Sequence, residues 1–252
     1  MNRRNYLALA MGSPIFLVVL WWGATSFGLI KSIYLPPPQI IFENFLNLLS
    51  TGYSGISLVS HVDASLQRIL FGFFIGSVIG TFLGILRGRF ASIDAIFLVP
   101  SEMFRPVPPL ALVPLFILWF GIGEKSKDLL ILFPVLLITM VTAEDAVRSI
   151  QTDLIRAAQT LGANRVQILR LIIFPAALPR IMTGLRVAMG NAWSILIAAE
   201  MLGGDRGLGF IILDASNFFR TAYVISGIII IGIFGFLSDR TILFVKSRFI
   251  HW

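Results

Sequence analysis

The chain has 252 residues, of which 57% are hydrophobic and only 13% are charged. This balance excludes an ordinary soluble domain, because too few polar residues are present to cover the apolar ones. The net charge of +7 would favour nucleic-acid binding in a soluble protein, but no dense basic stripe with interleaved aromatic residues is present. The absence of cysteine excludes disulfides, thiolate metal sites and thiol catalysis. The composition therefore predicts an all-α integral membrane protein that binds no nucleic acid.

Hydropathy predicts six membrane-spanning helices in one transmembrane domain, 1–252. Four apolar segments lack charged side chains over about the length that a ~30 Å hydrocarbon core demands. Two others, around 129–143 and 187–199, are shorter and need residues from their charged flanks to cross. The expected spans are 7–30, 67–87, 96–121, 127–146, 182–203 and 221–241.

The distribution of Lys and Arg gives the expected orientation, because cytoplasmic loops carry an excess of both residues. With both termini inside, most of these residues, including those of the loop at about 147–180, lie on the cytoplasmic side. We therefore expect both termini and this loop to be cytoplasmic.

A stripe of glycines with a strict interval of four runs along the second expected span: Gly72, Gly76, Gly80, Gly84 and Gly88. Each step of four residues turns an α-helix by ~400°, so the stripe drifts by ~40° per step. Such a stripe suits a close, crossed neighbouring helix, and we expect a role in helix packing. The alternative is that the glycines line a narrow, moving pathway.

The sequence lacks the common patterns of enzymes and nucleotide-binding proteins. No Gly-x-x-x-x-Gly-Lys-Ser/Thr loop is present, and neither His61 nor His251 belongs to a His-Glu-x-x-His metal motif. We therefore predict no catalytic, cofactor-binding or metal-binding residue, and we do not expect the chain itself to bind ATP.

Two ionisable residues, Arg105 and Glu200, fall within or close to expected spans. Charged groups at membrane depth are costly and are seldom without a role. Arg105 is a candidate to attract an anion through a water-filled passage, because the prolines at 106–109 break the helix beside it. A structural ion pair of Arg105 with Glu102 or with Glu200 is the equally weighted alternative.

The segment 156–175 is basic, contains Gly162 and ends at Pro175. We expect a short helix to end near Gly162 and a second helix to run toward Pro175 and stop there. Arg156, Arg165 and Arg170 should face water or an acidic partner. The segment therefore suits docking, with an ordinary amphipathic surface loop as the alternative.

The same segment carries a resemblance to a known family. Ala157 and Ala158, followed by Gly162, Ile172 and Pro175, fall in register with the Glu-Ala-Ala…Gly…Ile-x-Leu-Pro cytoplasmic loop of ABC importer permeases. The chain resembles that family.

Further motifs narrow the resemblance to the nitrate, sulfonate, taurine and bicarbonate permeases. They occur in the order typical of that branch, at 35–38, 105–114, 118–124, 183–186, 198–201 and 207–209. Within the branch, the sequence of residues 155–162, Ile-Arg-Ala-Ala-Gln-Thr-Leu-Gly, looks most similar to that of taurine permeases.

The resemblance implies a six-helix type I importer bundle in a bacterial inner membrane. Two copies of the permease would form a dimer with two cytoplasmic ATPase subunits, which hold ATP and Mg, and an external solute-binding protein. The implied substrate is taurine or an aliphatic sulfonate, with nitrate or bicarbonate as the alternatives. An ion-coupled secondary carrier is the alternative of a different class, and it would not require the docking loop.

The resemblance also assigns the ATPase-coupling residues. They are Ala157, Ala158, Gly162, Ile172 and Pro175, which would fill a groove on the ATPase. At Arg156 the chain departs from the family, which usually has glutamate there. Asp153, one helical turn earlier, is the candidate to supply the missing carboxylate contact.

Overall fold

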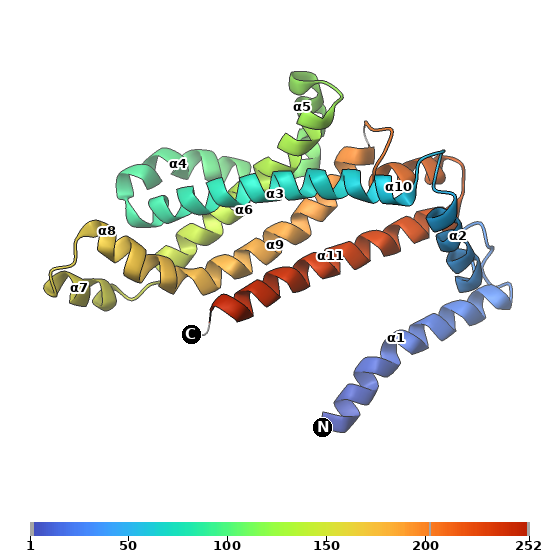
Figure 1. Ribbon diagram of the computed structural model, residues 1–252, viewed down its shortest axis with the longest axis horizontal. Coiled ribbons are helices and arrows are strands. Elements are labelled where there is room, and N and C mark those ends of the chain that lie inside the picture. The colour runs from blue at the N-terminus through green and yellow to red at the C-terminus, as the bar shows by residue number, and fades with distance from the viewer. Residues whose placement is uncertain (1–2, 202, 251–252) are drawn as a thin grey trace. The chain divides into compact units, whose positions relative to one another are not determined.

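The computed structural model describes residues 3–201 and 203–250, which fold mainly into helices (Figure 1). In chain order these are α1 (Arg3–Ser26), α2 (Pro38–Ser50), α3 (Leu58–Arg89), α4 (Ala91–Phe104), η1 (Pro109–Leu112), α5 (Val113–Phe120), α6 (Glu124–Arg148), α7 (Thr152–Thr160), α8 (Arg165–Ile168), the π-helical turn η2 (Leu169–Ile173), α9 (Phe174–Met201), α10 (Leu208–Asn217) and α11 (Thr221–Phe249). The chain divides into two compact units. The first comprises Met1–Asp63 and Asp205–Ile231, and the second comprises Ala64–Gly204 and Gly232–Trp252.

Four of the described helices are long and apolar enough to cross a membrane: Leu58–Arg89, Glu124–Arg148, Arg165–Met201 and Thr221–Arg248. A fifth span results if the bent pair Ala91–Phe104 and Pro109–Phe120 is counted as one. The first expected span, 7–30, falls on α1 and on the residues that follow it. The prediction of six spans therefore stays a prediction.

The expected span 96–121 is broken rather than straight. Its two halves, α4 and η1 with α5, are bent by 91°. Proline lacks the N–H for the helical ladder and disfavours helical backbone in the residue before it. The prolines at 106, 108 and 109 therefore account for the break, which lies immediately after Arg105.

The glycine stripe of α3 faces α6 along its whole length. A Cβ placed at Gly80 would lie 2.4 Å from the Leu136 carbonyl oxygen, and one at Gly84 would lie 2.2 Å from the Met140 carbonyl oxygen. The other three glycines meet α6 in the same way, at Ile131, Val135 and Val147. Because carbonyl oxygens of a helix cannot move aside, a side chain at these positions would push the two helices apart. The stripe thus sets the position of α3 on α6.

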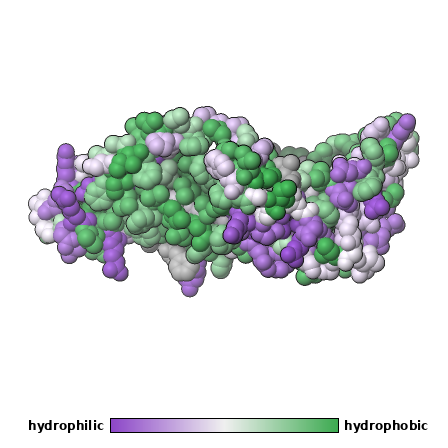
Figure 2. Space-filling model, turned by 90° about the horizontal axis from the view of Figure 1, so that it is seen from above, coloured by the Kyte–Doolittle hydropathy of each residue, from purple (hydrophilic) through white to green (hydrophobic). Residues whose placement is uncertain are grey.

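The core of the second unit lies between α6 and α9. At Gly184 of α9 a Cβ would lie 2.3 Å from the Thr142 hydroxyl oxygen of α6, so these helices also approach closely. Side chains of both helices are fully buried, among them Ile131, Val135, Met140, Ala143, Ala188, Ala192 and Leu196. Hydrophobic residues also cover much of the face that Figure 2 shows. An apolar exterior of this kind fits a protein surrounded by lipid.

The first unit contains a buried polar network around His61. The His61 side chain is fully buried, and its Nδ1 accepts a hydrogen bond from the Gly207 N–H at 3.1 Å. The Tyr53 hydroxyl donates to Asp214 at 2.7 Å. Burial and this carboxylate raise the pKa of Tyr53 to about 12. His61 therefore serves as a core residue that joins the first turn of α3 to Gly207, the residue before α10.

Candidate functional site

Helix α7 of the coupling segment ends in a glycine turn. Gly162 has a φ of +83°, its N–H donates to the Gln159 carbonyl at 3.0 Å, and the Ala163 N–H donates to the Ala158 carbonyl at 3.0 Å. This is the Schellman pairing, which satisfies the last carbonyls of a helix. A Cβ at Gly162 would meet nothing within 4 Å, so backbone conformation rather than space favours glycine here. The prediction that a helix ends near Gly162 is confirmed.

The prediction that the next helix stops at Pro175 is wrong. Asn164 caps α8 by accepting a hydrogen bond from the Gln167 N–H at 2.9 Å. From there the chain continues through η2 into α9 as one apolar helical stretch, Arg165–Met201. Pro175 lies in the first turn of α9, where its missing N–H follows a π-helical turn that already departs from the regular ladder. Much of the segment expected as a loop is therefore helical.

One face of α7 is available to a partner. Asp153, Arg156 and Ala157 are all exposed, and Asp153 lies 3.7 Å from Arg156 through their charged atoms. Two large apolar side chains, Leu154 and Leu161, are also exposed. The expected carboxylate and arginine thus share a solvent-facing surface with apolar neighbours.

The remaining expected coupling residues are not on that face. Ala158 is buried in an apolar cluster that includes Ile168 and Ile173. Ile172 and Pro175 are half-buried. Ala158 belongs to this cluster and Ile172 packs against it, so both help to hold the segment to the second unit.

Arg105 lies at the C-terminal end of α4 and lines a cavity. Its Nη1 lies 3.7 Å from the nearest Glu102 carboxylate oxygen, and both side chains are more than half exposed. The cavity has a volume of about 310 Å³ and includes Ser101, Thr142 and Asn191 among otherwise mainly apolar neighbours from α4, α6 and α9. Arg105, which the sequence predicted to line a passage, therefore lies at an open cavity, and its one nearby carboxylate is that of Glu102.

Glu200 lies elsewhere, so the alternative of an Arg105–Glu200 pair is wrong. The Glu200 side chain is fully buried and accepts hydrogen bonds from Arg68 Nη1 at 2.6 Å and from the Ser65 hydroxyl at 2.8 Å. Arg68 also donates to Glu124 at 2.8 Å. We call Ser65, Arg68, Glu124 and Glu200 the Arg68 cluster. The sequence analysis did not single out Arg68, which lies at the start of the expected span 67–87, so it missed this cluster.

A second cluster joins α3, α4 and α6 near the other end of α3. The buried Arg87 lies 3.1 Å from Asp94 and 3.0 Å from Glu144. Arg148 lies 2.5 Å from Asp94 and 3.0 Å from Glu144, so two arginines and two carboxylates alternate. Arg68 and Arg87 are separated by ~28 Å at ~1.5 Å per helical residue, close to the ~30 Å thickness of a hydrocarbon core. The two clusters therefore bracket an apolar stretch of membrane thickness.

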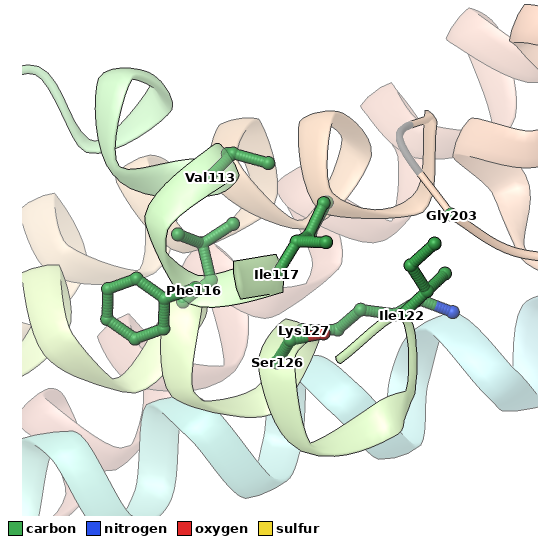
Figure 3. A pocket seen from close by; sticks show the side chains of 9 residues that line it. Val113, Phe116, Ile117, Ile122, Ser126, Lys127 and Gly203 are labelled. Atoms are coloured by element: carbon green, nitrogen blue, oxygen red, sulfur yellow. The ribbon is translucent and has the colours of Figure 1, made fainter. Parts of the chain in front are cut away.

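A small pocket near the Arg68 cluster is too narrow for a solute. It lies between α5, the start of α6 and Gly203, and apolar side chains such as Phe116 and Ile122 line it (Figure 3). Its volume of about 10 Å³ corresponds to about one water molecule. The cavity at Arg105 is the better candidate for solute binding.

Comparisons with known proteins agree with this arrangement. Residues 76–251 match the family model for the binding-protein-dependent transport system inner membrane component. The chain is 40% identical to the taurine transport system permease protein TauC of Escherichia coli (strain K12), covering 98% of this chain and 90% of that protein. It is 35% identical to the putative aliphatic sulfonates transport permease protein SsuC of Bacillus subtilis (strain 168), and the match covers 95% of this chain and 85% of that protein.

The fold is also similar to that of a solved transporter chain, from inward-facing conformations of the MetNI methionine ABC transporter. The TM-score is 0.62 at 22% identity, and the match covers 77% of this chain and 94% of that chain. This likeness concerns the fold alone. Together with the family match, which extends over most of the sequence, it leads to one conclusion: the chain belongs to the binding-protein-dependent transport system inner membrane component family, the non-catalytic permease subunits of ABC transporters.

Proposed function

We propose that this chain is the transmembrane subunit of an ATP-driven importer that moves a small anionic or zwitterionic solute, taurine or an aliphatic sulfonate, into the cytoplasm by alternating access. The likeness to TauC and SsuC over nearly the whole chain supports this substrate class. Nitrate or bicarbonate is the alternative within the same branch. An ion-coupled secondary carrier is the alternative of another class, and family membership counts against it.

The observation that carries the substrate class is the position of Arg105 at the cavity. At 3.7 Å the contact with Glu102 is too long for a hydrogen bond, so the guanidinium keeps its N–H donors available. Asn191 lines the same cavity. One N–H of its side-chain amide donates to the Val187 carbonyl at 2.9 Å, and the second N–H is available to a ligand. A sulfonate carries three acceptor oxygens and one negative charge, which suit a guanidinium and an amide. The volume of about 310 Å³ is at the lower end of the range for small-ligand sites.

The neighbouring carboxylate favours taurine over a simple anion. Taurine carries an ammonium group two carbons from its sulfonate, and Glu102 lies beside Arg105 on the same helical turn. Arg105 would receive the sulfonate and Glu102 the ammonium. Because both side chains are exposed, their mutual ion pair is weak and is readily exchanged for contacts with a zwitterion.

For energy coupling we propose that the exposed face of α7 docks on a cytoplasmic ATPase. Asp153 would provide the carboxylate contact that Arg156 cannot, and Gly162 would set the turn that presents α7. The remaining partners are a second copy of the chain, a second ATPase subunit with its ATP and Mg, and an external solute-binding protein. Both termini are proposed to be cytoplasmic in a six-span type I arrangement.

Vesicles that contain the permease, its ATPase and its solute-binding protein test the function. Labelled taurine should accumulate when ATP is supplied on the cytoplasmic side, and unlabelled alkanesulfonates should compete. Accumulation of nitrate or bicarbonate without taurine would overturn the substrate class only. Uptake that does not depend on ATP would overturn the importer itself.

The proposed topology has a separate test, because the chain has no cysteine of its own. A cysteine at Asn164, in the turn before α8, should react with membrane-impermeant thiol reagents only after permeabilisation. A cysteine at Ser54, between α2 and α3, should react in intact spheroplasts. The reverse pattern would invert the orientation.

A further inference from the structure

A second, larger cavity runs between α3 and the helical stretch formed by α8, η2 and α9. We call it the α3–α9 groove. Its volume is about 610 Å³, and most of its lining is apolar, including Phe73, Phe74, Val78 and Phe82 of α3. Phe74, Val78 and Phe82 are each more than half exposed. The groove is therefore an open, apolar channel along the surface of the second unit, separate from the cavity at Arg105.

The groove does not suit a polar solute. Arg170, Ser77 and Thr81 are the only polar side chains among the residues that line it. The Ser77 hydroxyl already donates to the Phe73 carbonyl of its own helix. A hydrophilic substrate would lose its hydration in this groove with few hydrogen bonds to replace it.

Arg170 places a positive charge in this otherwise apolar lining. Its side chain is exposed, and among the described residues it has no ion-pair partner. It lies on η2, while Leu86, at the same end of the groove, directly precedes Arg87 on α3. By the proposed orientation this end faces the cytoplasm, where membrane lipids are often anionic.

The length of the groove matches a lipid tail. From Leu86 to Phe73 the lining extends ~20 Å along α3, at ~1.5 Å per residue. This exceeds half of the ~30 Å hydrocarbon core, which is the depth that one leaflet fills. An acyl chain whose headgroup is at Arg170 would therefore stay within the groove over its whole length.

The side chains also argue against a second protein helix as the occupant. Close helix pairs in membranes use small residues at their contact, and α3 already presents its glycine stripe to α6. The face of α3 toward the groove carries phenylalanines instead. We infer that the α3–α9 groove holds one acyl chain of an anionic phospholipid of the cytoplasmic leaflet, whose phosphate pairs with Arg170.

Photo-crosslinking tests this site. The full-length chain is placed in phosphatidylcholine nanodiscs with a trace of phosphatidylglycerol that carries a diazirine midway along one acyl chain. After illumination, digestion and mass spectrometry should find the label on peptides from 73–82 and 174–185. Arg170→Gln should reduce this labelling about fivefold, the factor expected for one arginine near an anionic lipid. Arg170→Lys, which keeps the charge, should retain most of it.

Arg165→Gln is the matched control, because Arg165 is also exposed on this segment but does not line the groove. It should leave the labelling unchanged. Equal labelling by a phosphatidylcholine probe, or equal labelling of the Arg170→Gln variant, would overturn the anionic-lipid site. A disulfide between two copies of a Phe82→Cys variant, with the groove peptides unlabelled, would also overturn it and would assign the groove to a second chain.

Discussion

Arg68 and Arg105 are both arginines on helices of the second unit, yet their surroundings differ in almost every respect. The Arg68 side chain is 4% exposed and holds two carboxylates, Glu200 at 2.6 Å and Glu124 at 2.5 Å. The Arg105 side chain is 64% exposed and has only Glu102 at 3.7 Å. One arginine is thus buried and fully paired, and the other is exposed and weakly paired.

The difference shows which charge is free to act on a solute. Removing Arg68 would leave Glu200 buried without its cation, which is costly in a low-dielectric interior. Arg105 can exchange its weak contact for a ligand at little cost, because both it and Glu102 are already hydrated. We therefore propose that Arg68 serves the stability of the fold and that Arg105 handles the transported solute.

Arg68→Gln should have the largest effect on stability. Breaking a buried pair by removing one partner costs about 3–5 kcal/mol, so the variant should be scarce in the membrane and should unfold at a much lower temperature in detergent. The double variant Arg68→Met, Glu200→Met should recover much of this loss, because no unpaired charge remains. A single variant as stable as the wild type would remove the structural role of the Arg68 cluster.

The glycine stripe sets how α3 lies on α6 and hence where Arg68 sits, so its alteration should have the next largest effect. Gly80→Ala brings a methyl group within 2.4 Å of the Leu136 carbonyl oxygen and should cost about 1–3 kcal/mol. Gly190→Ala is the matched control, because a Cβ there meets nothing within 4 Å. Thermal unfolding of the two variants should differ clearly. Equal midpoint temperatures of unfolding for Gly80→Ala and Gly190→Ala would mean that α3 and α6 are not closely packed.

A smaller effect is expected at the turn of the coupling segment. Gly162→Ala must keep a φ of +83° with a Cβ present, which costs about 1–2 kcal/mol. The cost is local to α7, so the chain should remain folded while substrate-stimulated ATP hydrolysis by the assembled transporter falls. Hydrolysis unchanged from wild type would argue against α7 as the coupling element.

Arg105→Gln should have the smallest effect on stability. Surface substitutions away from buried networks usually change the free energy of unfolding by no more than about 0.5 kcal/mol. The variant should therefore match the wild type in membrane abundance and unfolding temperature. A loss like that of Arg68→Gln would show that Arg105 has a structural role instead.

Features that depend on residues close together in the sequence could be predicted from local sequence patterns. The interval of four glycines predicted a close helix contact, and Gly162 predicted the end of a short helix. Both follow from backbone geometry within a few turns. The break after Arg105 likewise follows from adjacent prolines.

Contacts between residues that are far apart in the sequence could not be predicted from such local signals. Arg68 and Glu200 are 132 positions apart, and only the packing of α3 against the other helices brings them together. Pro175 was misjudged because a π-helical turn before it allows the helix to continue. Hydropathy placed Arg105 within a span, but it could not show that the bend of 91° leaves the side chain at an open cavity.

We propose one role for Arg105: it serves the transported solute and not the fold. It is tested most directly by ATP-driven uptake of labelled taurine into vesicles that contain the complete transporter, with ATP hydrolysis measured in the same preparation. We predict that Arg105→Gln abolishes uptake while the complex still assembles and hydrolyses ATP, and that Arg105→Lys retains part of the uptake. Full uptake by Arg105→Gln would contradict this role of Arg105.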